Sequence, residues 1–169
     1  KLFISLILFL TSFCLNAQPP HYADSLLAFR GRYISTHEVI KEKDRAGLQF
    51  YDIDKKYYVP VKVERIYEAP WFAMETSGKL KKTFRVYAVL HFTLNGKPLK
   101  LSVYQSQQLM SSEEYKDYLF IPFTDPTNGG ETYENGRYID LQTGDLEKEA
   151  VYLDFNKTYN PYCAYISNV

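Results

Sequence analysis

Residues 83–106 read TFRVYAVLHFTLNGKPLKLSVYQS, and this stretch decides the fold class. Positions of even number from Phe84 to Phe92 are apolar, whereas the odd positions between them include Arg, Tyr and His. A period of two places one apolar face on a β-strand. The pair Asn95-Gly96 then interrupts the pattern, and two-residue hairpin turns prefer this pair because both positions tolerate positive φ. The stretch therefore predicts two antiparallel strands, 83–94 and 98–106.

Other segments are similarly rich in β-branched and aromatic residues and are separated by turn residues. We expect strands there, at 48–53, 57–67, 70–76, 118–123, 137–142 and 150–155, with turns at 76–79 and 143–144. Strands do not alternate with long helices, so a parallel sheet is not expected. Residues 47–169 are thus predicted to be a mainly β domain of about eight strands. Its antiparallel meander would form a barrel or a two-layer sandwich, preceded by an N-terminal helix.

Residues 18–46 are predicted to form this helical lead-in. Tyr22, Leu26, Phe29 and Tyr33 are spaced four, three and four apart, which places them on one face of a helix. Ser35 and Glu38 have the spacing of a capping box, so a break near Ser35 and a second helical stretch are expected. A single helical turn is also expected at 112–115, inside the polar stretch 107–117.

The first 17 residues are typical of a secretory signal peptide. An apolar run, 2–10, follows Lys1, and the small residue Ala17 marks a plausible cleavage point. The chain begins with Lys rather than Met, so we expect the natural N-terminus to lie upstream. Phe13 before Cys14 disfavours a lipoprotein, so cleavage near Ala17 and a periplasmic or secreted location are expected.

Composition limits the classes of partner. Without residues 1–17, the chain would keep 152 of its 169 residues and lose only the charge of Lys1 from a balance of 20 basic and 20 acidic residues. Nucleic-acid binding is not expected, because it requires a clustered positive charge. A second long apolar segment is absent from the sequence, so we expect no transmembrane segment in the mature chain. The three histidines are scattered, which leaves too few ligands for zinc, and no cofactor is predicted.

A dense block of polar, glycine and tyrosine residues occupies the last quarter of the chain. Several separated motifs in this block, in the same order, strongly resemble a bacterial family catalogued as domain of unknown function 1684. The motifs are Pro122-Phe123, Asp125 to Tyr138, Asp154-Phe155-Asn156, Tyr159-Asn160-Pro161 and Cys163-Ala164-Tyr165. The resemblance implies an exported or envelope-associated protein without an assigned activity. It also implies that a C-terminal tail is missing here, and that Cys163 forms a disulfide with a cysteine of that tail.

The same block supplies the candidate ligand-binding residues. Carboxylates, amides and one guanidinium lie at strand ends or in the following loops, and tyrosines would provide aromatic walls. A polar small molecule or a glycan fragment would bind between loops 124–138 and 154–165. The candidates are Asp125, Asn128, Thr132, Tyr133, Arg137, Tyr138, Asp154, Asn156, Tyr159 and Asn160.

Other functions of the block stay open at this point. The same residues could simply tie the loops together, with Arg137 paired to Asp125 or Asp154. A hydrolase could use Asp125 and Asp154 as an acid–base pair if the fold brings them together. A purely structural envelope protein would need no pocket. The sequence therefore does not decide whether the protein is an enzyme, and it identifies no catalytic or metal-binding residue.

Overall fold

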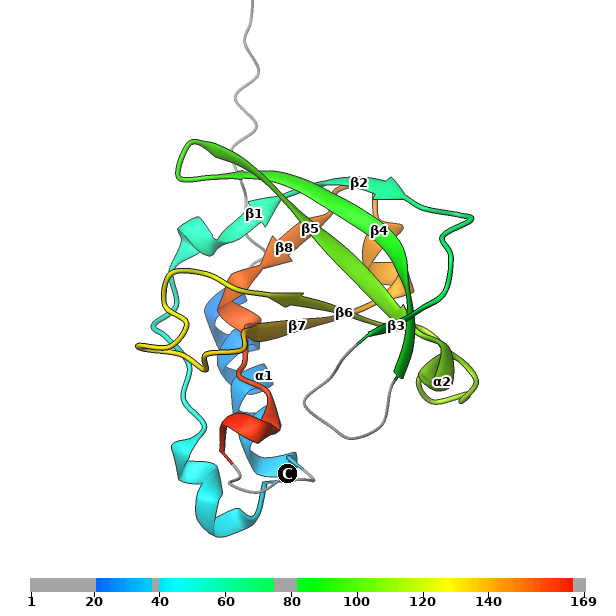
Figure 1. The fold of residues 1–169 in the computed structure, drawn as a ribbon. Helices are drawn as coiled ribbons and strands as arrows, with labels where there is room; N and C mark the ends of the chain where they lie inside the picture. Colours follow the sequence, from blue (N-terminus) through cyan, green and yellow to red (C-terminus); the bar gives the residue numbers. More distant parts are fainter. Residues whose placement is uncertain (1–20, 38–39, 75–81, 166–169) are drawn as a thin grey trace, which may run out of the picture.

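The computed structural model describes residues 21–37, 40–74 and 82–165, and within these ranges eight strands form two antiparallel sheets (Figure 1). The larger sheet has the order β2-β4-β5-β6-β7, with β3 also paired to β4, and the smaller sheet pairs β1 with β8. The strands are β1 (Tyr58–Pro60), β2 (Lys62–Arg65), β3 (Phe72–Met74), β4 (Lys82–Leu94), β5 (Lys97–Ser106), β6 (Tyr118–Phe123), β7 (Arg137–Gln142) and β8 (Tyr152–Asp154).

The predicted fold class is confirmed. An N-terminal helix precedes a mainly β domain, and the sheet does not close into a barrel, which favours the two-layer alternative. The longest helix is α1 (Tyr22–Thr36), and α2 (Gln107–Met110) is a single turn. Short 3-10 helices are η1 (Glu42–Gly47), η2 (Lys55–Tyr57), η3 (Thr143–Leu146), η4 (Phe155–Lys157) and η5 (Tyr162–Ala164).

The hairpin predicted from residues 83–106 is confirmed as β4 and β5. Asn95 and Gly96 both have positive φ, at 50° and 73°, and Leu94 pairs with Lys97 across the turn. The apolar face of β4 contributes to the core between the two layers. Buried residues of this core come from most strands: Val59, Tyr87, Ala88, Leu90, Phe92, Val103, Leu119, Ile121, Ile139 and Leu153, with Leu146 of η3.

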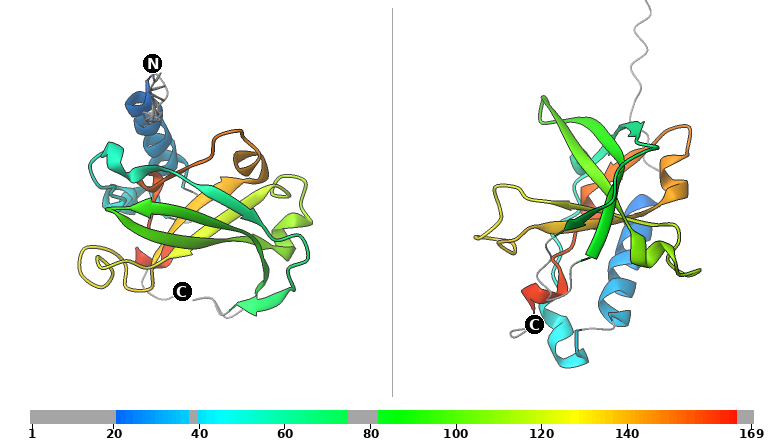
Figure 2. Two further views of the ribbon diagram at one scale, coloured as in Figure 1. Left: turned by 90° about the horizontal axis from the view of Figure 1, so that it is seen from above. Right: turned by 45° about the vertical axis from the view of Figure 1, so that its right-hand side comes forward.

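Helix α1 packs on the domain with the predicted stripe. Leu26 is buried, and Tyr22, Phe29 and Tyr33 are half-buried. Helix α1 contacts the C-terminal segment η4, and it lies away from the β4–β5 turn in Figure 1 and in the right-hand view of Figure 2. The helix ends at Thr36, close to the expected break. Glu38 of the expected capping box, the expected signal peptide 1–17 and the expected turn 76–79 lie outside the described residues.

Three local predictions were wrong. Segment 48–53 is not a strand but an extended connection: Phe50 packs toward α1, with its ring 5.7 Å from that of Tyr33, while the Tyr51 hydroxyl donates to Glu131. Segment 57–67 is two strands, because the chain changes sheet around Val61, whose N–H donates to Val151. The helical turn comes earlier than 112–115, because the Ser106 hydroxyl caps α2 by accepting a hydrogen bond from the Leu109 N–H.

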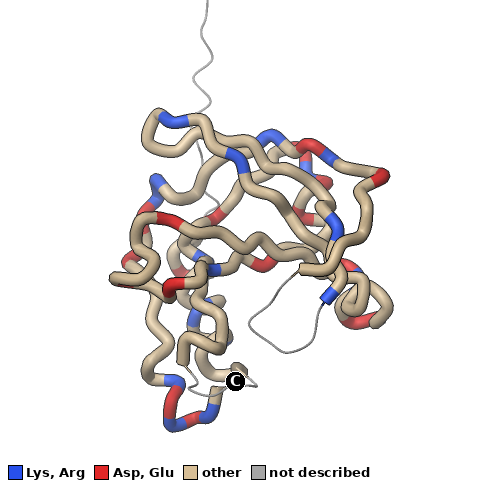
Figure 3. Tube along the Cα trace, viewed as in Figure 1, with Lys and Arg blue, Asp and Glu red and all other residues tan. Residues whose placement is uncertain are grey.

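Basic and acidic residues are interleaved along the described chain (Figure 3). Within the described ranges, none of the helices has both the length and the apolar character that a membrane crossing needs.

Candidate functional site

The loop between β6 and β7 lies beside the segment that follows β8. The Tyr133 N–H donates to Asn160 Oδ1 (3.3 Å). Tyr138 and Tyr159 form an antiparallel bridge with backbone hydrogen bonds of 2.9 and 3.1 Å. Residues more than 20 positions apart therefore meet at one end of β7, as the candidate site requires.

An ion pair anchors this end of β7. The Arg137 guanidinium donates to Asp125 Oδ2 through Nη2, and the Thr127 N–H donates to Asp125 Oδ1 (2.8 Å). The side chains of Arg137 and Asp125 are only 14% and 24% exposed. Burial alone would raise the pKa of Asp125, but the hydrogen bonds from Thr127 and Arg137 outweigh it, so the pKa lies below its usual value.

The backbone before Arg137 depends on glycine. Gly136 has a φ of 103°, and a Cβ atom there would lie 2.7 Å from the carbonyl oxygen of Phe123. A side chain at this position would therefore be strained by its conformation and by the close backbone. Gly136 lets Arg137 begin β7 directly beside the end of β6.

Asn128 and Thr132 hold the loop together from within. The Asn128 amide donates to the Tyr133 carbonyl (2.7 Å) and to Thr132 Oγ1 (3.1 Å), and it accepts from the Asp125 N–H (2.5 Å). Thr127 and Thr132 also join their hydroxyl groups (2.9 Å). The side chain of Asn128 therefore stabilises the loop through its own hydrogen bonds. This agrees with the alternative in which the polar residues of the block tie the loops together.

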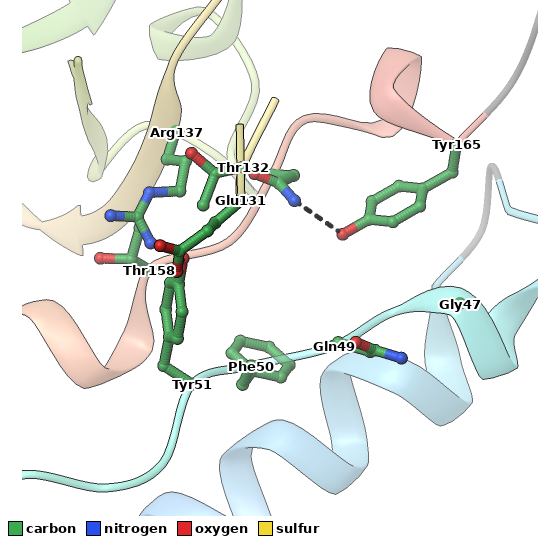
Figure 4. A pocket seen from close by; sticks show the side chains of 10 residues that line it. Gly47, Gln49, Phe50, Tyr51, Glu131, Thr132, Arg137, Thr158 and Tyr165 are labelled. Atoms are coloured by element: carbon green, nitrogen blue, oxygen red, sulfur yellow. Dashed lines mark hydrogen bonds between the residues drawn. The ribbon is translucent and has the colours of Figure 1, made fainter. Parts of the chain in front are cut away.

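A pocket of ≈ 240 Å³ opens beside Arg137 (Figure 4). Arg137, Thr158 and Tyr51 gather at one end of it, while Tyr165 lies on the opposite side from the Tyr51 and Phe50 segment. Its lining residues are Gly47, Gln49, Phe50, Tyr51, Glu131, Thr132, Arg137, Thr158, Asn160 and Tyr165.

Several donors at this pocket lack a protein partner. Within the described residues, only Nη2 of the Arg137 guanidinium donates a hydrogen bond, and the buried Nε has none. The buried Thr158 hydroxyl also has no partner among the described residues. The guanidinium carbon lies 5.5 Å from the ring centres of both Tyr51 and Phe123, which hold it in place. Two residues of the lining, Arg137 and Thr158, therefore keep buried donors that no described protein group uses.

Asp154 and Asn156 belong to a different cluster. With Tyr22 and Asp54 they form what we call the α1 clasp. Tyr22 donates to Asp154 Oδ1 (2.8 Å), and the Asn156 amide donates to the same oxygen (3.1 Å) and to the Asp54 carbonyl (3.0 Å). Arg30 also donates to the Asn156 carbonyl (2.7 Å). This cluster attaches α1 to the β domain.

Tyr138 and Tyr159 lie apart from the pocket as well. Successive residues of a strand point to opposite faces, so the Tyr138 side chain leaves β7 on the other face from that of Arg137. The Tyr138 and Tyr159 rings pack edge to face with centres 6.0 Å apart. Of the ten candidates, the pocket thus gathers Arg137, Thr132 and Asn160, with Asp125, Asn128 and Tyr133 directly behind them.

Sequence reasoning missed the other wall of the pocket. The sequence pattern predicts a strand at Phe50 and Tyr51, and Glu131, Thr158 and Tyr165 are not among the ten candidates. Glu131 accepts a hydrogen bond from the Tyr51 hydroxyl (2.9 Å), which links the two walls across 80 residues. Glu131, Thr158 and Tyr165 lie inside the polar block, and this position was the one sequence signal that could have indicated them. The segment around Phe50 has no comparable enrichment in polar residues, so its role in the pocket had no sequence signal.

The fold and the site define a mainly β domain with a small polar pocket between two loops and an N-terminal segment. The chain belongs to the family described as protein of unknown function (DUF1684), whose sequence model matches residues 43–169. A solution NMR structure of an uncharacterized protein of Haloarcula marismortui is similar, with 28% identity and a TM-score of 0.63. The alignment covers 85% of this chain and 80% of that one. No match is found among curated proteins.

Proposed function

We propose that this chain is an exported protein that binds a small, neutral polar ligand, such as a glycan fragment, in the pocket beside Arg137. One observation carries the proposal: two side chains of the pocket, Arg137 and Thr158, keep donors without a partner among the described residues. A buried donor without an acceptor costs about 1–3 kcal/mol, so a ligand oxygen that accepts from it would gain that amount on binding.

Charge favours a neutral ligand over an anion. Arg137 is already paired with Asp125, and Glu131 adds a second carboxylate to the lining. The surroundings therefore carry more negative than positive charge, which would repel a phosphate or a carboxylate. Hydroxyl and ether oxygens accept hydrogen bonds without bringing a charge.

Size and lining agree with a single sugar-like ring. The pocket volume of ≈ 240 Å³ is below the roughly 300–1,000 Å³ of pockets for drug-sized molecules. Phe50, Tyr51 and Tyr165 supply apolar ring surface beside the polar donors. Aromatic walls with a few fixed polar groups are typical of sites that bind small molecules.

Export is proposed from the sequence pattern of residues 1–17, with a periplasmic or secreted mature protein. The hydrolase alternative receives no support from the contacts: none of the hydrogen bonds between described residues joins Asp154 to Asp125 or Arg137. The Asp154 residue is only 7% exposed, and its Oδ1 accepts hydrogen bonds within the α1 clasp.

The binding proposal is tested with Thr158→Val, which removes the partnerless hydroxyl and keeps the side-chain shape. The matched control is Thr93→Val on the exposed side of β4. A panel of neutral monosaccharides and disaccharides is titrated into the full chain and followed by calorimetry. We expect at least one sugar to bind, with an affinity about ten-fold weaker in Thr158→Val and unchanged in Thr93→Val.

The thermal stability of ligand-free Thr158→Val should equal or exceed that of the unchanged protein, since a buried unsatisfied group is lost. Binding of none of the sugars, or equal affinity in both variants, would reject this pocket as a sugar site. The first result would favour the envelope interaction role.

A further inference from the structure

The face of β7 opposite Arg137 presents a second cluster. Asp140 and Tyr138 lie on it, because they alternate with Arg137 and the buried Ile139. Phe120 of β6 is directly across from Asp140 in the register, and Tyr159 is bridged to Tyr138. We call this cluster the Asp140 face; its residues are Tyr118, Phe120, Tyr138, Asp140 and Tyr159.

The carboxylate of Asp140 is held in one orientation with half of its acceptor capacity unused. Its Oδ1 accepts hydrogen bonds from the hydroxyls of Tyr118 (2.8 Å) and Tyr159 (2.7 Å). Within the described residues, its Oδ2 accepts none, and none of the ion pairs includes Asp140. The side chain is exposed, yet the rings around it displace enough water that desolvation raises the pKa of Asp140 despite the two tyrosine donors.

Aromatic residues are neighbours of Asp140 in the sheet and pack on one another. Phe120 is stacked with Tyr118, with ring centres 6.4 Å apart, and it meets Tyr138 edge to face at 6.1 Å. From α1, the Tyr33 ring lies 5.0 Å from the Tyr159 ring, and its buried hydroxyl has no partner in the described part of the chain. A carboxylate without an ion-pair partner among the described residues is therefore combined with several aromatic rings.

We propose that the Asp140 face binds a protonated amine. Both features of the cluster attract a cation: the carboxylate by charge, and the ring faces through their quadrupole. An ammonium group carries N–H donors that match the unused Oδ2. An anion or an uncharged alcohol gains neither attraction. This site is separate from the Arg137 pocket and does not depend on the function proposed for it.

The test uses n-butylammonium chloride as the probe and n-butanol as its neutral counterpart. Each is titrated into the isotope-labelled full chain and followed by amide NMR shifts. We expect saturable shifts at β6, β7 and residues near Tyr159 with butylammonium, and none that saturate with butanol. Equal shifts with the two probes, or no saturation with butylammonium, would overturn the proposal without any variant being needed.

A variant pair separates charge recognition from fold. Asp140→Asn keeps an acceptor for the two tyrosine hydroxyls but removes the charge, and Asp44→Asn in η1 is the exposed control. We expect butylammonium to bind about ten-fold more weakly to Asp140→Asn and with unchanged affinity to Asp44→Asn. An amide spectrum that stays native in Asp140→Asn, together with undiminished binding, would show that Asp140 only ties the Tyr159 segment to the sheet.

Discussion

The α1 clasp gives a stability prediction that tests the placement of the N-terminal helix. Asn156 is 5% exposed, and its amide joins two partners that are distant in sequence, Asp54 and Tyr22, and a third within its own turn, Asp154. In Asn156→Ala, Asp54 would lose the acceptor of its N–H (2.9 Å) and the donor to its carbonyl (3.0 Å). Tyr22 and Asp154 would keep their own hydrogen bond (2.8 Å).

A buried group left without a partner costs about 1–3 kcal/mol, and for the half-buried groups of Asp54, which water reaches in part, we take about 1.5 kcal/mol each. Two such groups give an expected loss of about 3 kcal/mol, a large part of the roughly 5–15 kcal/mol by which a domain is stable. With a urea m-value of about 2 kcal/mol/M, the midpoint of unfolding should fall by about 1.5 M. The measurement is urea unfolding followed by circular dichroism.

The matched control is Asn135→Ala, which removes one exposed hydrogen bond between Asn135 and the Tyr133 hydroxyl (3.0 Å). Its free energy of unfolding should change by less than about 0.5 kcal/mol, as is usual for the surface. If Asn156→Ala unfolds at the same urea concentration as Asn135→Ala, the clasp does not hold α1 and our account of it is wrong.

Three further predictions concern the loop and export. Gly136→Ala should destabilise the domain by about 1–3 kcal/mol, whereas Gly144→Ala, with open space around it, should be nearly neutral; equal thermal shifts would contradict this. Because the pKa of Asp125 is lowered in the folded state, its ionised form stabilises the protein above about pH 3.9, and this contribution is lost as the pH falls through the folded pKa. Asp125→Asn should therefore lose less stability than the unchanged protein between pH 5 and pH 2 (roughly the range in which a depressed carboxyl titrates) in acid unfolding experiments. Deletion of residues 1–17 should keep the protein in the cytoplasmic fraction, and its continued export would refute a signal peptide.

The longer strands could be predicted because apolar and polar residues alternate along them, and one face of the sheet is buried while the other is more exposed. In 83–106, one face is apolar and the Asn95-Gly96 turn has a defined conformation, so sequence and structure agree almost residue by residue. The α1 stripe succeeded for the same reason, since Leu26 is buried where the helical period places it. Family motifs in the last quarter also marked the loops that meet beside Arg137.

The structure divides the ten candidates among the Arg137 pocket with its supporting loop, the α1 clasp and the opposite face of β7. The sequence could not predict this division. Arg137 and Tyr138 are adjacent in sequence, but alternation along β7 sends them to opposite faces, and only the sheet register says which face has the pocket. Asp154 was predicted to bind a ligand, but its carboxylate is buried and hydrogen-bonded within the α1 clasp. An aspartate in either role looks the same in the sequence. The Phe50 and Tyr51 wall was missed because an apolar run of that length fits a strand as well as an extended segment packed on a helix.

The pairing of β1 with β8 sets the order in which the molecule can assemble. Tyr58 lies opposite Asp154, so the smaller sheet and the attachment of α1 both need residues from the last part of the chain. The β4–β5 hairpin needs only neighbouring residues and can form while the ribosome is still adding the residues that follow it. Closing contacts between remote segments is slow. The domain should therefore stay open until β8 has been synthesised, with the smaller sheet added after the larger one.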